Sequence, residues 1–271
     1  MERSLSAVLF LVASVALSIC AGAWWMQRIV FTPDDTRDTA AAILAEPDIR
    51  QELNTVISGA SAPTLGVQAA DLGAMLENDV LTTRLGAAVM APIIKDAHQR
   101  IIGLHDAPVQ VTGSQMIEIV RDERAADVST VTLPIQVIGT LKTLRSALGW
   151  LMPIAGGIGI LVLLLGIFAR PERNEVMRAL GEFGLALALA MLLFGYAIPV
   201  HMITAIDNST WTHAIPRLAN RTLPVVLGAA AIFGLGGLAL IMGASSGGGK
   251  RRQFSTPLAV GRYRSDGPGW G

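Results

Sequence analysis

The residues of this chain whose types and spacing best suggest chemistry are two histidines and an aspartate in its second half. His201, Asp207 and His213 fall within a stretch of 13 residues. Imidazole nitrogens and carboxylate oxygens bind cations, and histidine changes its charge near neutral pH. The trio predicts a polar loop site that binds a cation or responds to acidity. The alternative interpretation is three solvated loop residues beside a membrane.

A second pair of histidines has a simpler explanation. His98 and His105 lie close in sequence to Asp96 and Asp106, a combination that includes metal-binding residue types. However, Gly103 interrupts the helix that would align the two histidines on one face. We therefore expect both histidines to be exposed near a helix end.

Three neighbouring aspartates are the nearest candidates for a catalytic carboxylate cluster. They are Asp34, Asp35 and Asp38. Acidic residues also gather in the first turn of helices, because they complement the positive end of the helix dipole. We expect Asp34 or Asp35 to cap a helix here, and we predict no catalytic residue.

Familiar catalytic signatures are absent from the sequence. It contains no Gly-x-Ser-x-Gly nucleophile elbow, no His-Glu-x-x-His pair and no Gly-x-x-x-x-Gly-Lys phosphate loop. The single cysteine, Cys20, excludes an intramolecular disulfide and a cysteine-cluster zinc site. The sequence therefore predicts a protein that is not an enzyme and that carries no cofactor and no resident metal.

The candidate residues above lie within, between or beside four long stretches that contain no charged residue. They lie between Arg3 and Arg28, Arg145 and Arg170, Glu182 and Asp207, and Arg221 and Lys250, and each holds 24 to 28 residues. A helix needs roughly 20 apolar residues to cross a bilayer core of about 30 Å. We therefore predict four spans, near residues 5–25, 147–169, 180–200 and 223–243. None of the four has a charge at its centre, which argues against a proton pump.

The rest of the pattern predicts four regions. We expect an N-terminal membrane anchor over 1–27, a helical extracytoplasmic domain over 28–146, a three-span bundle over 147–245 and a flexible basic tail over 246–271. The second region reads as consecutive short helices, followed by short strands near 109–112 and 129–133 that would form a two-stranded ribbon. The fold class is thus mainly α: a polytopic four-span bundle with a small helical domain.

Charge near the ends of the spans predicts the orientation. Arg170, Arg173 and Arg178 separate spans two and three, and Lys250, Arg251 and Arg252 follow span four. Since such residues favour the cytoplasmic side, we expect both termini in the cytoplasm of a plasma-membrane protein, with residues 28–146 outside. The basic tail would also adhere to anionic lipid. Span one alternatively reads as a signal peptide, because Ala21-Gly22-Ala23 resembles a cleavage site.

The acidic region between spans one and two excludes one class of partner. Residues 26–146 hold 10 basic and 15 acidic groups, a net charge of −5. Nucleic-acid binding requires a basic surface that replaces phosphate counterions. We therefore expect no nucleic-acid partner.

The order of these features resembles a group of actinobacterial four-span integral membrane proteins of unknown activity. The resemblance rests on Ile43-Leu-Ala-Glu-Pro-Asp-Ile-Arg-Gln-Glu-Leu53, on a strand ending near Leu133-Pro134, and on the Arg-rich turn Ala169-Arg-Pro-Glu-Arg173. It covers residues 1–245 and brings no catalytic residues with it. It implies a cell-envelope protein with an outward-facing helical domain.

Three functions compete at this point. The first is a non-enzymatic scaffold or accessory subunit that contacts the lipid bilayer and binds a membrane or envelope protein, or a second copy of itself. The second is a small transport or channel subunit with a polar cavity lined by Thr204, His201 and Asp207. The third is a membrane enzyme that acts on lipid-linked or cell-wall substrates, for which the aspartates at 34, 35 and 38 are the nearest candidates. We favour the first.

Overall fold

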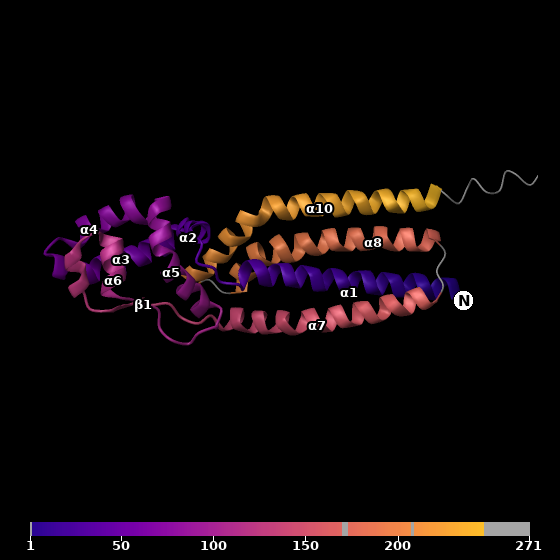
Figure 1. Ribbon diagram of the computed structural model, residues 1–271, viewed down its shortest axis with the longest axis horizontal. Coiled ribbons are helices and arrows are strands. Elements are labelled where there is room, and N and C mark those ends of the chain that lie inside the picture. The colour runs from indigo at the N-terminus through magenta and orange to yellow at the C-terminus, as the bar shows by residue number, and fades with distance from the viewer. Residues whose placement is uncertain (1, 170–172, 207–208, 247–271) are drawn as a thin grey trace, which may run out of the picture.

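The computed structural model describes residues 2–169, 173–206 and 209–246. It consists of a bundle of long parallel and antiparallel helices with a compact group of short helices at one end (Figure 1). We call the short helices and their connections, residues 31–138, the head. The predicted mainly helical class, with four long apolar helices and a two-stranded sheet, is confirmed.

Four helical segments are long and apolar enough to cross a membrane. Helix α1 covers Glu2–Val30 and α7 covers Gly139–Phe168. The third segment begins as α8 (Arg173–Leu192) and continues through a π-helical stretch, η3 (Leu193–Met202), into α9 (Ile203–Ile206). The fourth is a 3-10 turn, η4 (Thr210–His213), followed by α10 (Ala214–Ser246). The most apolar part of each segment has a mean hydropathy between 2.1 and 2.5.

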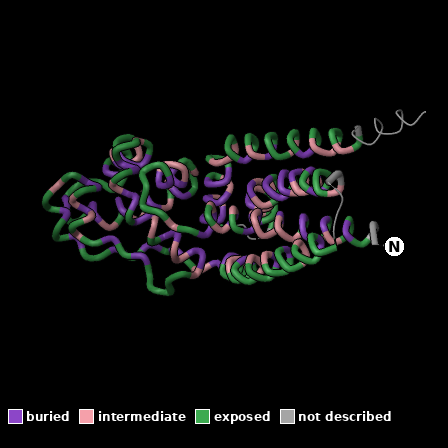
Figure 2. Tube along the Cα trace, turned by 45° about the vertical axis from the view of Figure 1, so that its right-hand side comes forward, coloured by how far each residue is buried: buried purple, intermediate pink, exposed green. Residues whose placement is uncertain are grey.

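Apolar side chains cover the outside of this bundle. Exposed residues recur along the long helices (Figure 2). They include Leu161 and Phe168 on α7, and Ile232 and Leu235 on α10. A water-soluble protein rarely exposes such a continuous apolar surface. The four helices therefore fit a multi-pass membrane protein whose outer faces contact lipid.

Small residues let the bundle helices approach closely. A Cβ atom added at Gly181 on α8 would lie 2.6 Å from the carbonyl oxygen of Gly237 on α10, and one added at Gly184 would lie 2.8 Å from that of Phe233. On α7, a Cβ at Gly159 would lie 2.7 Å from Leu17 of α1. Small residues at these positions thus serve packing within the bundle.

The head begins with two helices whose starts and ends follow local chemistry. Helix α2 (Arg37–Leu44) is capped by Thr36, whose hydroxyl accepts from the Thr39 N–H, so the predicted cap at Asp34 or Asp35 is wrong. Helix α3 (Pro47–Leu65) continues through Gly59 and is closed by Gly66, which adopts a left-handed conformation. Gly59 has open space around it, so nothing requires the helix to end there.

The remaining head elements complete a small core. Helix α4 (Ala69–Leu76) passes into a π-helical turn, η1 (Glu77–Leu81), and then α5 (Arg84–Ile101) begins at its cap Thr83. Strand β1 (Gln110–Val111) pairs antiparallel with β2 (Val131–Thr132) and confirms the ribbon. Between the strands lie α6 (Gly113–Val120) and a 3-10 turn, η2 (Glu123–Asp127). Leu85, near the start of α5, is 72% exposed although it is apolar.

Candidate functional site

The junction between the head and the bundle shares one hydrophobic core. Side chains from the end of α1 (Met26 and Val30) and the start of α7 (Leu141) belong to the same buried cluster as the head helices. Trp211 and Ile215, from the segment before and within α10, also belong to it. Because these side chains are removed from water together, the head and the adjoining ends of the spans form one packed unit.

A buried histidine ties the head to the end of the first span. His98 on α5 is only 5% exposed, so the prediction of an exposed helix-end histidine is wrong. Its Nε2 lies 2.7 Å from the carbonyl oxygen of Val30, to which it donates. Its Nδ1 is buried and has no partner within the described residues. Burial lowers the pKa of His98, although the Val30 carbonyl and the negative charge of Asp34 oppose the change, so the ring is held neutral.

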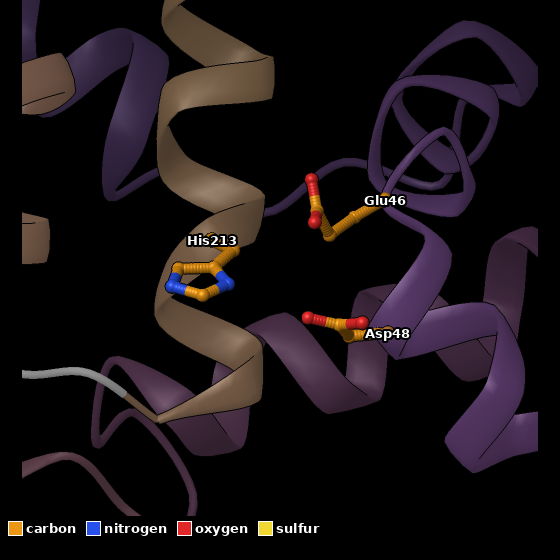
Figure 3. Close-up of side chains that lie close together, drawn as sticks. All are labelled: Glu46, Asp48 and His213. Atoms are coloured by element: carbon orange, nitrogen blue, oxygen red, sulfur yellow. The ribbon is translucent and has the colours of Figure 1, made fainter.

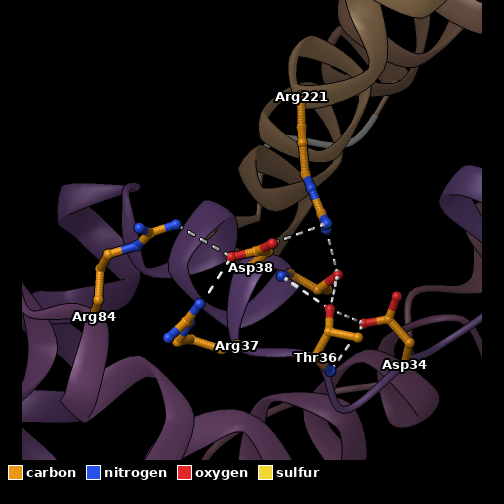
Figure 4. A network of polar contacts seen from close by, with 7 residues as sticks. Asp34, Thr36, Arg37, Asp38, Arg84 and Arg221 are labelled. Carbon is orange, nitrogen blue, oxygen red and sulfur yellow. Dashed lines mark hydrogen bonds and ion pairs between the residues drawn. The ribbon is translucent and has the colours of Figure 1, made fainter.

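An arginine at the start of the apolar part of α10 reaches into the head. The Nη1 of Arg221 donates to the Thr39 hydroxyl at 2.7 Å, and its Nη2 lies 3.8 Å from Asp38 (Figure 4). Asp38 also lies 3.6 Å from Arg84. Asp34, in turn, accepts from the Thr36 hydroxyl at 2.9 Å. These contacts join residues separated by more than 180 positions in the sequence.

Asp34 stays ionised in this network. Burial alone would raise the pKa of Asp34, but hydrogen bonds from Thr39 and Thr36 and the charge of Arg221 lower it below its usual value. The carboxylate therefore places a fixed negative charge beside the Arg221 guanidinium at neutral pH.

A cavity of about 360 Å³ lies at this junction, and we call it the junction cavity. Its lining is polar on one part and apolar on another. The polar residues are Arg28, Thr32, Asp34, Thr39, His98, Arg221 and Thr222, and the apolar ones are Ile29, Leu218 and Val225. Helices α1 and α10 thus supply one part of the lining, whereas the head supplies Thr32, Asp34, Thr39 and His98.

A second polar cluster joins the head to the bundle on α3 and η4. Glu46, Asp48 and His213 place one ligand atom each within 4.8 Å of the others (Figure 3). These are donor types that a divalent cation accepts. However, the Nε of Arg217 donates to Glu46 Oε2 at 2.9 Å and supplies positive charge to this cluster. The Arg217–Glu46 ion pair can therefore hold the head against the start of α10 without a metal.

The predicted trio is divided between two environments. His213 lies beside Glu46 and Asp48, an association across the chain that sequence spacing did not indicate. His201 is exposed, and its ring meets Tyr196 edge-on with centroids 5.8 Å apart. Asp207 lies outside the described residues, as do Lys250, Arg251 and Arg252 of the basic tail.

The aspartate cluster is engaged in structural contacts. Asp35 pairs with Lys95 at 3.3 Å, and Asp38 lies within 4 Å of basic side chains from α2, α5 and α10. These pairs are largely exposed, so each contributes little to stability, and only the pair with Arg221 joins the head to α10.

Sequence reasoning missed the junction cavity, although one signal pointed to it. Arg28 and Arg221 are the charged residues that bound the apolar stretches of α1 and α10 on the same side. If both helices cross one bilayer, the two arginines must lie at similar depth. His98 carried no such signal, because its burial depends on how α5 packs against α1.

Comparisons with known proteins add no identification. No protein family, curated protein or solved structure matches this chain.

Proposed function

We propose that this chain is a non-enzymatic membrane protein of the cell envelope, in which the head faces outward and binds another envelope component as a scaffold or accessory subunit. The observation that carries the proposal is the core shared by the head and the bundle. A head that is packed onto its spans presents its surface at a fixed height and angle above the bilayer. A scaffold needs this property, whereas a tethered binding module does not.

The polar contacts across the junction support the same proposal. Trp211 Nε1 donates to Glu52 at 3.3 Å, and the Arg217–Glu46 and Arg221–Thr39 contacts lie on other parts of the same boundary. Together with the contact between His98 and Val30, these contacts connect the head to the end of α1 and to η4 and the start of α10. The exposed side of the head remains available to a partner.

The cavity between the spans argues against solute transport. It measures about 320 Å³ and is lined by α1, α7 and α8 side chains that are almost all apolar, including Phe10, Leu17 and Phe183. Ser14 is its polar residue. Such a lining suits lipid chains and does not replace the hydration shell of an ion or a polar solute.

Orientation is tested most directly by cysteine labelling. Cys20 is the single cysteine, so a Cys20→Ser background accepts one new cysteine at a chosen site. We expect Asp71→Cys, on the exposed face of α4, to react with a membrane-impermeant maleimide in intact cells. Reaction only after the cells are opened would place the head in the cytoplasm and overturn the proposed orientation.

Partner binding is tested by photo-crosslinking in living cells. A photoreactive amino acid at Asp71 or Asn78, both exposed on the head, should capture the same protein at both positions. The matched control is Leu161, an exposed position on the apolar surface of α7, which should capture lipid. The proposal is wrong if the head positions give no discrete protein adduct while the control reacts normally.

A further inference from the structure

We propose that the junction cavity binds the phosphate headgroup of an anionic phospholipid, with Arg28 as the principal contact. The site lies where the apolar stretches of α1 and α10 meet the head. It is independent of any protein partner of the head, so it stands apart from the scaffold proposal.

Arg28 supplies the strongest argument. Arg28 lines the cavity and is exposed, and among the residues that the structure describes its side chain has no ion pair and no hydrogen-bond partner. By contrast, most arginines of the head and the junction have a carboxylate or a carbonyl oxygen within reach, as Arg221 has Thr39 and Asp38. A guanidinium presents five N–H donors in a planar fork that matches phosphate oxygens. Arg28 thus has its full set of donors available for a ligand.

The charge balance of the cavity favours an anion. Arg28 and Arg221 carry two positive charges, whereas Asp34 carries one negative charge. His98 is neutral and adds none. The lining therefore has a net charge of +1. Phosphate diesters carry a single negative charge, so one bound headgroup would balance it.

The position and the mixed lining favour a lipid over a free phosphate. Arg28 and Arg221 end the charge-free stretches of α1 and α10, and basic residues at the ends of spans lie at headgroup depth. Ile29, Leu218 and Val225 form the apolar part of the lining. A glycerol backbone and the first acyl carbons would cover these side chains, whereas inorganic phosphate would leave them in contact with water.

The surface next to the cavity also suits a ligand that carries acyl chains. Val225 is exposed and lies on α10, in the apolar stretch that would contact lipid. Helices α1 and α10 make few contacts with each other, because α8 lies between them along most of the bundle (Figure 1). An acyl chain can therefore leave the cavity along α10 without passing through packed protein.

The test uses the full chain in nanodiscs and native mass spectrometry. The probes are phosphatidylglycerol, phosphatidylcholine of the same chain length, and inorganic phosphate. We expect the protein to retain phosphatidylglycerol in preference to phosphatidylcholine. Arg28→Gln should weaken that retention about fivefold, the change expected from one basic group worth roughly 1 kcal/mol at the membrane surface. Arg28→Lys should restore part of it.

Two further variants make the result decisive. Val225→Trp fills the apolar part of the cavity without altering charge and should also reduce retention. Arg84→Gln is the matched control, since Arg84 is an exposed arginine of the head that does not line the cavity, and it should bind lipid as the wild type does. Arg28 has no partner to lose, so we expect Arg28→Gln to keep the melting temperature of the wild type, which separates binding from folding.

Several results would overturn the proposal. Equal retention of phosphatidylcholine would show that the headgroup charge is not recognised. Competition by inorganic phosphate alone, with no effect of Val225→Trp, would assign the cavity to a free anion. Equal losses in Arg28→Gln and Arg84→Gln would indicate a general surface-charge effect.

Discussion

The imidazole of His98 donates from Nε2 to the carbonyl oxygen of Val30 at 2.7 Å, and so joins α5 of the head to the last residue of α1. In the neutral ring this leaves Nδ1 without a proton, and that atom is buried and has no partner among the described residues. Protonation of His98 would place a positive charge in a buried position. The ring contacts Val30, which lies 68 residues away in the sequence. The boundary between the head and the bundle therefore contains a group whose protonation destabilises the folded state.

The stability of the protein should fall as the pH drops below the ordinary histidine pKa of 6.5. Burial lowers the pKa of His98 in the folded state, so the unfolded chain binds the proton more readily. Stability is thus fully present above pH 6.5 and is lost toward the lower folded pKa, by up to about 1.4 kcal/mol per pH unit. Thermal unfolding of the purified protein between pH 7.5 and 5 measures this slope.

The His98→Gln variant provides the control for that slope. Glutamine retains an N–H that can donate to the Val30 carbonyl but does not titrate. Arg28, Asp34 and Arg221 line the same cavity, and the lowered pKa of Asp34 affects stability only below its usual value of 3.8. An unchanged slope in the variant would assign the pH dependence to other groups.

Substitution of Gly237 by alanine should destabilise the bundle. The new Cβ would lie 2.6 Å from the carbonyl oxygen of Gly181, and backbone atoms cannot move aside as a flexible side chain can. Overpacking of this kind costs about 1–3 kcal/mol. Gly236→Ala is the control, because nothing lies within 4 Å of a Cβ at Gly236. Equal melting temperatures for the two variants would contradict the close contact between α8 and α10.

Truncation of Trp211 should weaken the attachment of the head. Trp211 is 5% exposed, lies in the shared core and donates to Glu52. We expect Trp211→Ala to cost about 3–5 kcal/mol, and Trp211→Phe, which keeps an aromatic ring, to cost less. Trp150→Ala removes an indole that is 70% exposed and should have little effect. Chemical denaturation, combined with limited proteolysis of the head, distinguishes these outcomes.

Removal of Arg217 should convert the Glu46, Asp48 and His213 cluster into a cation site. In the wild type the guanidinium of Arg217 lies 2.9 Å from Glu46 and supplies positive charge. In Arg217→Gln the two carboxylates lose that charge, so Zn²⁺ should stabilise the variant more than the wild type. The gain is about 2.7 kcal/mol at a zinc concentration 100 times the Kd.

The zinc effect is checked by thermal shift with and without a chelator. Adding His213→Ala to Arg217→Gln should abolish the extra stabilisation, because only two of the three ligands remain. If the single and double variants respond to zinc equally, the metal binds elsewhere.

The sequence by itself determined the four long apolar helices and much of the local structure. Long charge-free stretches can only satisfy their backbone groups in lipid as helices, so length and composition were sufficient. Local signals also predicted the end of α5 before Gly103 and the β1–β2 ribbon. These features depend on residues that are close in the chain.

Only the tertiary structure decided what lies at the junction. The burial of His98, the meeting of His213 with Glu46 and Asp48, and the junction cavity each require α5, α3 and α10 to be placed against one another. Leu85 fits the helical spacing of apolar residues yet is exposed, since no element within the described residues covers its side chain. Periodicity indicates which residues share a face of a helix, but packing between distant segments determines which face is covered and which polar groups meet there.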